Sequence, residues 1–294
     1  MPIAWDEAQL LLTVCEHESF SGAAQHLGVG QATVSRRIAE LERRVGAVLF
    51  TRGRQGAVAT SAAHRLLPAA QQMARWAGEF QRAADANERN PEGTVRIAAP
   101  PGAAVEQLAP FAMLAKTRYP DIRLEILAAI EHVDLSLGIA DIALRMKPPN
   151  EPELHTLAST TTPIGVYASP GYAEKLDQPC HWADLDWVTW SHPYLEVTPR
   201  PMLERLIPDF VPVFTADDYL VQKSAVAAGL GAMIMSEPLL GTARDQGFVP
   251  LDMGVKLPPS QIHLVCAKSA LHIPRVQAIA GHLQELLASA YTAA

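Results

Sequence analysis

The chain has 294 residues, 49% of them hydrophobic, and a formal net charge of -7 at pH 7, which favours about two domains with sizeable cores. No segment approaches the roughly 20 continuous apolar residues of a membrane helix, and the first residues, MPIAWDEAQ, lack the basic and apolar regions of a secretory signal. Three widely spaced cysteines, Cys15, Cys180 and Cys266, indicate neither a disulfide framework nor a zinc site. We therefore expect a cytoplasmic protein with no membrane partner.

Three helices are predicted at the start of the chain. Apolar residues at helical spacing predict the first helix over Asp6–Glu18. The segment SGAAQHL predicts a second short helix, with Ser21 as its N-cap and Gly28 ending it. The third is expected over Gln31–Val45. Three helices with a glycine turn before the third are typical of a helix-turn-helix.

The third predicted helix has two different faces. Its apolar residues form one stripe: Val34, Ile38, Leu41 and Val45. The opposite face alternates alanine with arginine: Ala32, Arg36, Ala39 and Arg43. Small residues let the backbone come close to a surface, and the arginines beside them reach further. This is what a helix needs to enter the major groove of DNA.

Cations are concentrated around this helix. Residues 31–65 contain seven arginines and two glutamates, and no lysine precedes Lys116. Guanidinium groups bind phosphates and guanine edges in a forked geometry, so we expect double-stranded DNA as a partner. The alternative is a solvated helix face on which Glu40 pairs with Arg36 and Arg44.

The segment GAVLFTRGRQGAVAT predicts a short β-wing with Arg52 and Arg54 near its tip. Arginines there would lie along the DNA backbone or minor groove.

The segment FSGAAQHLGVGQATVSRRIAELERRVGAVLFTR resembles the N-terminal domain of LysR-type transcriptional regulators. The residues that carry the resemblance are Ala23, Ala24, Val34, Ser35, Leu41, Glu42, Gly46, Leu49, Phe50 and Arg52. The resemblance implies base and phosphate contacts at Gln31, Ala32, Ser35, Arg36 and Arg52. With the neighbouring polar and cationic residues, the expected DNA-binding set is Gln31, Ala32, Thr33, Ser35, Arg36, Arg37, Arg43, Arg52 and Arg54.

The sequence departs from the family pattern at two places. Gly30 stands where a serine or threonine is usual, so a hydroxyl N-cap is lost. After the wing, Ala59-Thr60 and Ala63 replace the usual Leu-Thr and glycine.

A long helix is expected from Thr60 or Ser61 to about Asn87, with a kink at Pro68. A heptad seam that alternates large and small residues runs along it: Leu66, Ala70, Met73, Ala77, Phe80 and Ala84. This seam predicts a dimerisation helix and a homodimer or tetramer. The alternative is a helix packed on its own domain, since Trp76 lies off the seam.

After the polar linker ANERNPEG, strands and helices alternate, which favours parallel sheets with crossover helices. Strands are expected in TVRIAAP, IRLEILAA, DIALRM, PIGVYAS, WVTWS, FVPVFTA, GAMIMS and QIHLVCAK. Helices are expected over Ala104–Thr117, over Val133–Ile139, from Gly171, over about Asp218–Ala228 and over about Pro274–Ala290. Connections near Ser159–Pro163 and Pro258–Gln261 would join two lobes.

The predicted fold is an α+β multidomain protein. We expect a winged helix-turn-helix domain over residues 1–60, a linker and dimerisation helix over 61–90, and a two-lobed α/β domain over 91–294. Lobe I is expected over about 91–161 and 266–294, and lobe II over about 162–265. This domain resembles the periplasmic-binding-protein-like effector domain of the same family, with Asp141-Ile142-Ala143 and Ala168-Ser169-Pro170 as matching segments.

The resemblance implies a small organic effector, such as a carboxylate, between the lobes. The expected effector-binding residues are Pro101, Gly102, Ala103, Ala104, Ser191, His192, Phe214 and Thr215. Free backbone N–H groups at the start of the first helix would attract an anion. Ordinary loops at strand ends are the alternative interpretation of these residues.

Enzyme motifs are missing from the sequence, so we expect no catalysis, cofactor or metal. There is no G-x-S-x-G, P-loop or H-E-x-x-H motif, and GLGAMI at Gly229 follows a helix rather than a strand. The function hypothesis is a sequence-specific DNA-binding regulator modulated by an effector. The alternatives are a small-molecule-binding protein or enzyme with an anchoring domain, and an effector-independent DNA-architectural protein. The resemblance further implies dimers of dimers, bent promoter DNA and contact with RNA polymerase.

Overall fold

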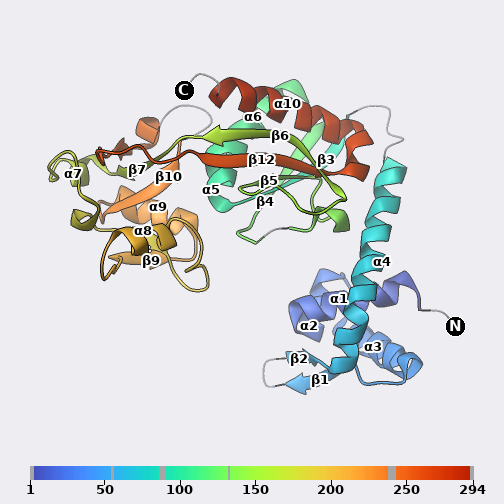
Figure 1. The fold of residues 1–294 in the computed structure, drawn as a ribbon. Helices are drawn as coiled ribbons and strands as arrows, with labels where there is room; N and C mark the ends of the chain where they lie inside the picture. Colours follow the sequence, from blue (N-terminus) through green and yellow to red (C-terminus); the bar gives the residue numbers. More distant parts are fainter. Residues whose placement is uncertain (1–2, 54–55, 86–90, 132, 238–242, 292–294) are drawn as a thin grey trace. The chain divides into compact units, whose positions relative to one another are not determined.

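The computed structural model describes residues 3–53, 56–85, 91–131, 133–237 and 243–291 (Figure 1). The chain divides into two compact units, one made mainly of residues 1–87 and the other mainly of residues 88–294. Each unit has at least one hydrophobic core of its own. Among the described helices, none is both long enough and apolar enough to cross a bilayer.

The N-terminal unit is a winged helix-turn-helix. Its elements are α1 (Trp5–His17), α2 (Phe20–His26), α3 (Gln31–Val45), β1 (Phe50–Gly53), β2 (Gly56–Ala59) and α4 (Ser61–Asp85). The predicted apolar stripe of α3 faces the core, where Val34, Ile38 and Leu41 are buried. The expected helix over Gln31–Val45 is confirmed at both ends.

The N-cap of α2 is Ser19, so the prediction of Ser21 was wrong. Ser19 is extended, and its hydroxyl accepts a hydrogen bond from the backbone N–H of Gly22 at 3.3 Å. Phe20 forms the first turn and packs its ring edge-on against Phe50, so the helix begins two residues earlier than SGAAQHL indicated. Ser21 lies inside the helix.

A carboxylate of α3 holds the start of the wing. Oε1 of Glu42 accepts hydrogen bonds from the backbone N–H groups of Leu49 at 2.7 Å and Phe50 at 3.1 Å. Between them, Gly46 ends α3 in the left-handed region, with φ of 74°. The Leu-Glu, Gly and Leu-Phe residues of the sequence motif therefore serve one purpose, which is to turn the chain from α3 into β1.

The C-terminal unit contains three sheets. The first sheet has the order β4-β3-β5-β12-β6 and consists of β3 (Gly93–Ala99), β4 (Ile122–Ala128), β5 (Ile142–Arg145), β6 (Leu154–Thr162) and β12 (Ser260–Ala267). The second sheet has the order β10-β7-β11 and consists of β7 (Ile164–Ala168), β10 (Ala232–Ser236) and β11 (Val249–Pro250). A two-stranded sheet joins β8 (Val188–Trp190) and β9 (Phe214–Ala216).

The helical elements of this unit vary in length. The α-helices are α5 (Pro101–Ala103), α6 (Ala109–Arg118), α7 (Pro170–Ala173), α8 (Arg200–Leu206), α9 (Tyr219–Ala227) and α10 (Pro274–Tyr291). A π-helix, η1 (Ala104–Leu108), separates α5 from α6. Short 3₁₀ turns are η2 (Leu135–Leu137), η3 (Trp182–Asp184), η4 (Ala243–Gln246) and η5 (Lys268–His272). In Figure 1, α10 lies along the first sheet beside α6.

The prediction of parallel sheets is wrong for most strand pairs. β3 runs parallel to β4 and β5, and β8 to β9, but β12 is antiparallel to β5 and β6. β10 and β11 are antiparallel to β7. The chain leaves the first sheet after β6, at Pro163, and returns from the second sheet through β12. Because β12 enters the first sheet from the opposite end, it runs antiparallel to its neighbours β5 and β6. β6 was not predicted, because its sequence LHTLASTTT is too polar to resemble a central strand.

Two predicted helices also differ from the structure. The helix expected over Val133–Ile139 is only the 3₁₀ turn η2, and α8 lies where none was expected. The helix expected from Ala104 begins at Pro101 and widens into η1. Pro110 explains the widening. In an α-helix, the proline ring would clash with the carbonyl of Glu106, and the proline has no N–H to donate to that carbonyl.

A buried carboxylate in the π-helix η1 joins this helix to α9 and η4. The side chain of Glu106 is fully buried. Its Oε1 accepts hydrogen bonds from the Tyr219 hydroxyl at 3.1 Å and Lys223 Nζ at 2.6 Å, and its Oε2 accepts one from Gln246 Nε2 at 3.0 Å. Lys223 also contacts Gln246 Oε1 and lies 5.3 Å from the Phe248 ring centre. Burial, and then the charge of Glu106, raise the pKa of Tyr219, so Tyr219 is a neutral donor.

Breaking this pair tests its contribution. Lys223→Met leaves a buried anion without its cation, so we expect a loss of about 3–5 kcal/mol in the free energy of unfolding. Adding Glu106→Gln removes the charge, and its amide oxygen can still accept from Gln246 while its NH2 group donates to the Tyr219 hydroxyl, so most of the loss is recovered. Amide hydrogen exchange in α6 and α9 measures both effects. Lys175→Met, at an exposed lysine, is the control. A Lys223→Met protein as stable as the parent would contradict this account.

Candidate functional site

The outer face of α3 is exposed along its length. Gln31, Ala32 and Arg36 are exposed, while Thr33 and Ser35, from the same predicted set, are half-buried. Gly30 supplies the N-cap without a side-chain hydrogen bond, so the first-turn N–H groups of α3 receive no hydroxyl from this residue.

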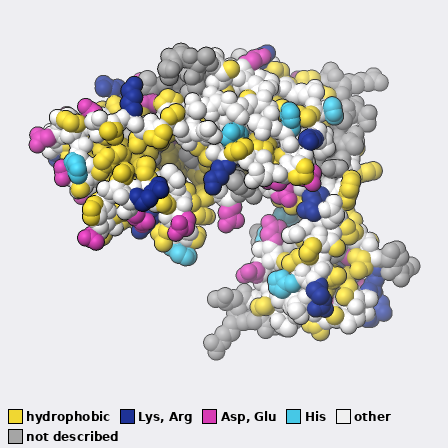
Figure 2. All heavy atoms as spheres, viewed as in Figure 1, with side chains coloured by type: hydrophobic (Ala, Val, Ile, Leu, Met, Phe, Trp, Pro, Cys, Tyr) yellow, Lys and Arg dark blue, Asp and Glu magenta, His cyan; other side chains and the backbone are white. Residues whose placement is uncertain are grey.

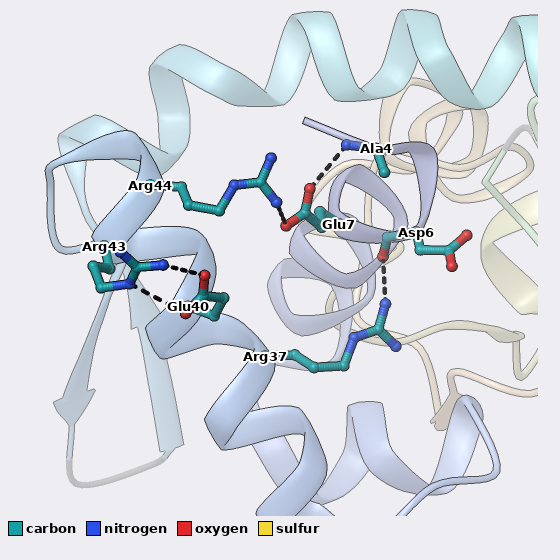
Figure 3. A network of polar contacts seen from close by, with 7 residues as sticks. All are labelled: Ala4, Asp6, Glu7, Arg37, Glu40, Arg43 and Arg44. Carbon is teal, nitrogen blue, oxygen red and sulfur yellow. Dashed lines mark hydrogen bonds and ion pairs between the residues drawn. The ribbon is translucent and has the colours of Figure 1, made fainter. Parts of the chain in front are cut away.

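Three of the arginines on α3 are held by acidic or carbonyl oxygens (Figure 3). Arg37 donates to the backbone carbonyl of Asp6 at 3.3 Å, and Arg44 pairs with Glu7. Glu7 also accepts a hydrogen bond from the N–H of Ala4 at 2.8 Å. These contacts fix α3 against the start of α1, so Arg37 and Arg44 position the helix.

The third arginine, Arg43, lies on the outer face. It forks onto Glu40, with Nε 3.2 Å from Oε2 and a second contact to Oε1. The hydrogen bond lowers the pKa of Glu40 and raises that of Arg43. Both groups are therefore charged at neutral pH.

Arg36 differs from the other three arginines of α3. It is exposed, and within the described part of the chain no hydrogen bond or ion pair engages it. Arg52 belongs to β1, although its side chain lies outside what the structure describes, and Arg54 lies outside the described residues altogether.

The long helix α4 has two different halves. In the first half, Ala70 is buried in the N-terminal core, and Leu66 and Met73 pack against it. In the second half, Phe80 is 80% exposed and Trp76 is 63% exposed. The predicted seam thus splits: its first half is covered by its own domain, while Ala77 is half-buried and Phe80 and Ala84 are exposed.

A cavity of about 580 Å³ lies in the C-terminal unit, between the first sheet and the second. One wall consists of the carboxyl end of β3 and the start of α5, including Pro101, Gly102 and Ala103. The facing wall includes Trp190, Tyr219, Gln222, Met233 and Met235. Figure 2 shows hydrophobic side chains gathered on the part of this unit that carries β7, β9 and β10.

Arg145 is the most deeply buried cation of the cavity wall. It is 4% exposed, and its guanidinium donates to Glu151 at 2.9 Å and to the carbonyl of Val133 at 3.2 Å. Burial would raise the pKa of Glu151, but the hydrogen bonds from Arg145 and the backbone lower it, so Glu151 is ionised. Lys147 also lines the cavity, as do the exposed carboxylates of Glu131 and Glu196.

The predicted effector residues are only partly brought together. Pro101, Gly102 and Ala103 line the cavity. Ala104 is buried behind them, and the remaining four are not among the lining residues: Ser191, His192, Phe214 and Thr215.

Trp190 takes the place expected for Ser191 and His192. Its indole N–H donates to the carbonyl of Thr198 at 3.2 Å, and Arg200 donates to its backbone carbonyl at 2.9 Å. These bonds turn the chain, so that Trp190 faces the cavity and His192 is exposed.

Sequence reasoning missed Arg145 and Tyr219. Arg145 is the charged residue that follows the apolar run Ile142–Leu144, and a charge at a strand's carboxyl end is a signal for a functional group. Tyr219 begins a helix and had no such signal, because its role depends on Glu106, a residue 113 positions away.

The comparisons with known proteins agree with this architecture. The family model of the bacterial regulatory helix-turn-helix protein, lysR family, matches residues 5–64, and the model of the LysR substrate binding domain matches residues 88–288. A probable HTH-type transcriptional regulator LrrA from Synechococcus elongatus is 31% identical over 235 residues, which cover 78% of this chain and 79% of that protein. An HTH-type transcriptional regulator from Xanthomonas campestris pv. campestris is 32% identical over 182 residues, 62% of this chain and 53% of that relative.

Solved structures show the same fold. The full-length structure of the Vibrio cholerae virulence activator AphB, a member of the LTTR protein family, has a TM-score of 0.59 at 20% identity and covers 96% of this chain and 98% of that chain. The expectation of a winged helix-turn-helix followed by a two-lobed α/β domain is thereby confirmed. Because the substrate-binding-domain match alone covers more than half of the sequence and the helix-turn-helix match precedes it, this chain belongs to the LysR family of transcriptional regulators.

Proposed function

We propose that this LysR-family regulator binds promoter DNA through the outer face of α3, with Arg36 in the major groove. The observation that carries the proposal is the division of the arginines: Arg37 and Arg44 hold α3 in place, and Arg36 is left exposed. Gln31 and Ala32 lie beside it at the start of the helix, where a recognition helix contacts base edges. We place this activity in the cytoplasm, where the promoters are. Contact with RNA polymerase and bending of the promoter rest on the family resemblance alone.

The main alternative function is that of an enzyme, and one serine–histidine pair could suggest a catalytic site. The Ser159 hydroxyl lies 2.8 Å from Nδ1 of His263. His263 is buried, however, and neither residue lines the cavity, so a substrate bound there could not reach the hydroxyl. We therefore propose a regulator without catalytic activity.

Arg36→Ala tests the DNA-binding surface. The probe is a duplex that the parent protein selects from a random-sequence library. We expect this variant to weaken binding of the selected duplex by about 1–3 kcal/mol and to reduce its preference over scrambled DNA. Fluorescence anisotropy at fixed salt measures both. Arg205→Ala, at an exposed arginine of α8, is the control. Unchanged affinity in Arg36→Ala would remove this residue from the groove.

We propose that the exposed half of α4 forms the dimer contact, through Trp76 and Phe80. These residues lie one helical turn apart, so they share a face. The seam expected from the sequence would then begin beyond Met73, which its own domain already covers.

Phe80→Asp tests the dimer contact. An aspartate there would place an unpaired charge between two helices, so we expect a lower oligomeric state in sedimentation velocity. Gln71→Asp is the matched control, because Gln71 is exposed and lies half a turn around the helix from Phe80. If the Phe80→Asp protein keeps the parent's mass, the main contact lies elsewhere.

We propose that the cavity binds a small organic anion, such as a carboxylate, as the effector. Support comes from Arg145 and Lys147 on its wall and from the apolar surface of Trp190, Met233 and Met235. Small-molecule sites combine an apolar body with a few polar groups in this way. The backbone of Pro101–Ala103 would complete the wall on the other side.

A thermal-shift screen of mono- and dicarboxylates on the full chain tests this proposal. A ligand at a hundredfold excess over its Kd stabilises the folded state by about 2.7 kcal/mol, so we expect a clear rise in Tm for at least one acid. Lys147→Met should reduce that rise, whereas Lys256→Met, at an exposed lysine outside the cavity, should not. Stabilisation by neutral or cationic metabolites alone would rule out an anionic effector.

A further inference from the structure

Glu40 is an acidic side chain on the face of α3 that should meet a polyanion. Its side chain is 51% exposed and that of Arg43 is 72% exposed, so a bound duplex could reach both. Arg36 lies about one turn before Glu40, and Arg43 lies about one turn after it. All three side chains are on the exposed side of the helix. A helix selected only for strong attraction to phosphates would not carry a carboxylate there.

The carboxylate would affect the proposed DNA binding in two ways. It would repel phosphates, which follow one another at one charge per about 1.7 Å of duplex. It also occupies the guanidinium of Arg43 with two contacts, and the hydrogen bond between them lowers the pKa of Glu40, which keeps it ionised. For Arg43 to bind a phosphate, it must leave Glu40 or share its donors.

We infer that Glu40 is a specificity-determining residue, which keeps Arg43 from binding any duplex through its phosphates. Non-specific affinity comes almost entirely from phosphate contacts, so Glu40 lowers it for every sequence. A phosphate contact changes the affinity for all duplexes about equally when the protein sits on them in the same way. On a cognate site, base contacts through Arg36 fix the helix in one register, whereas on other DNA the helix can shift until Arg43 meets a phosphate, so the cognate site loses less. Glu40 therefore raises the ratio of specific to non-specific affinity. This inference rests on the proposed DNA binding through α3.

The test is Glu40→Gln in the full chain, titrated against a random-sequence duplex at several salt concentrations. If the freed Arg43 binds one further phosphate, the plot of log K against log salt should steepen by about 0.9. The affinity of the variant relative to the parent should then be about threefold higher at about 50 mM than at about 200 mM salt. Binding to the selected duplex should improve less, so the specificity ratio falls.

Two further variants separate this mechanism from a general effect of net charge. Arg43→Gln combined with Glu40→Gln should abolish the improvement, because the freed guanidinium is gone. Glu16→Gln removes an exposed charge of α1 and should leave the salt dependence unchanged. An improvement that persists without Arg43, or an unchanged slope in Glu40→Gln, overturns the inference. If the parent binds no duplex at all, the proposed DNA binding fails first, and the two failures are thus distinguishable.

Discussion

The buried carboxylate of Glu106 is the interaction on which the C-terminal unit depends. A charge in the interior must be paired and hydrogen-bonded, so Tyr219, Lys223 and Gln246 have to meet there from two other elements. The need to satisfy one anion therefore fixes α9 and η4 against η1. Since the ring of Tyr219 also lines the cavity, a ligand that moves this ring acts on the same contact.

The N-terminal unit uses charge in a comparable way. Glu42 gathers the N–H groups at the start of the wing, and Glu7 holds Arg44, so both carboxylates serve the internal geometry. Arginines that are held in this manner give α3 a fixed direction. Under the proposed function, their neighbour Arg36 contacts DNA from a rigid support, which lowers the entropy lost on binding.

Local features could be predicted from the sequence, and long-range ones could not. The 3.6-residue periodicity of Val34, Ile38 and Leu41 was enough to define α3 and its exposed face. The cap of α2 was missed by two residues, because Ser19 and Ser21 are equally suitable caps and the packing of Phe20 decides between them. Strand direction and the cavity wall were harder, because β12 pairs with strands about 100 residues away and Trp190 is turned by bonds to its own loop.

The π-helix η1 has a consequence for how this protein can vary. A π-helical turn holds one residue more than an α-helical turn, so Ala104–Leu108 amounts to a one-residue insertion in an otherwise continuous helix. Pro110 donates no N–H to the carbonyl of Glu106, so the widening persists as long as this proline is present. The wide turn sets where Glu106 lies relative to α6, and the partners Tyr219 and Lys223 depend on that position. The preference of the cavity for its proposed ligand can therefore change by substitution at Pro101, Gly102 or Ala103, whereas a deletion in η1 would displace the carboxylate from its partners.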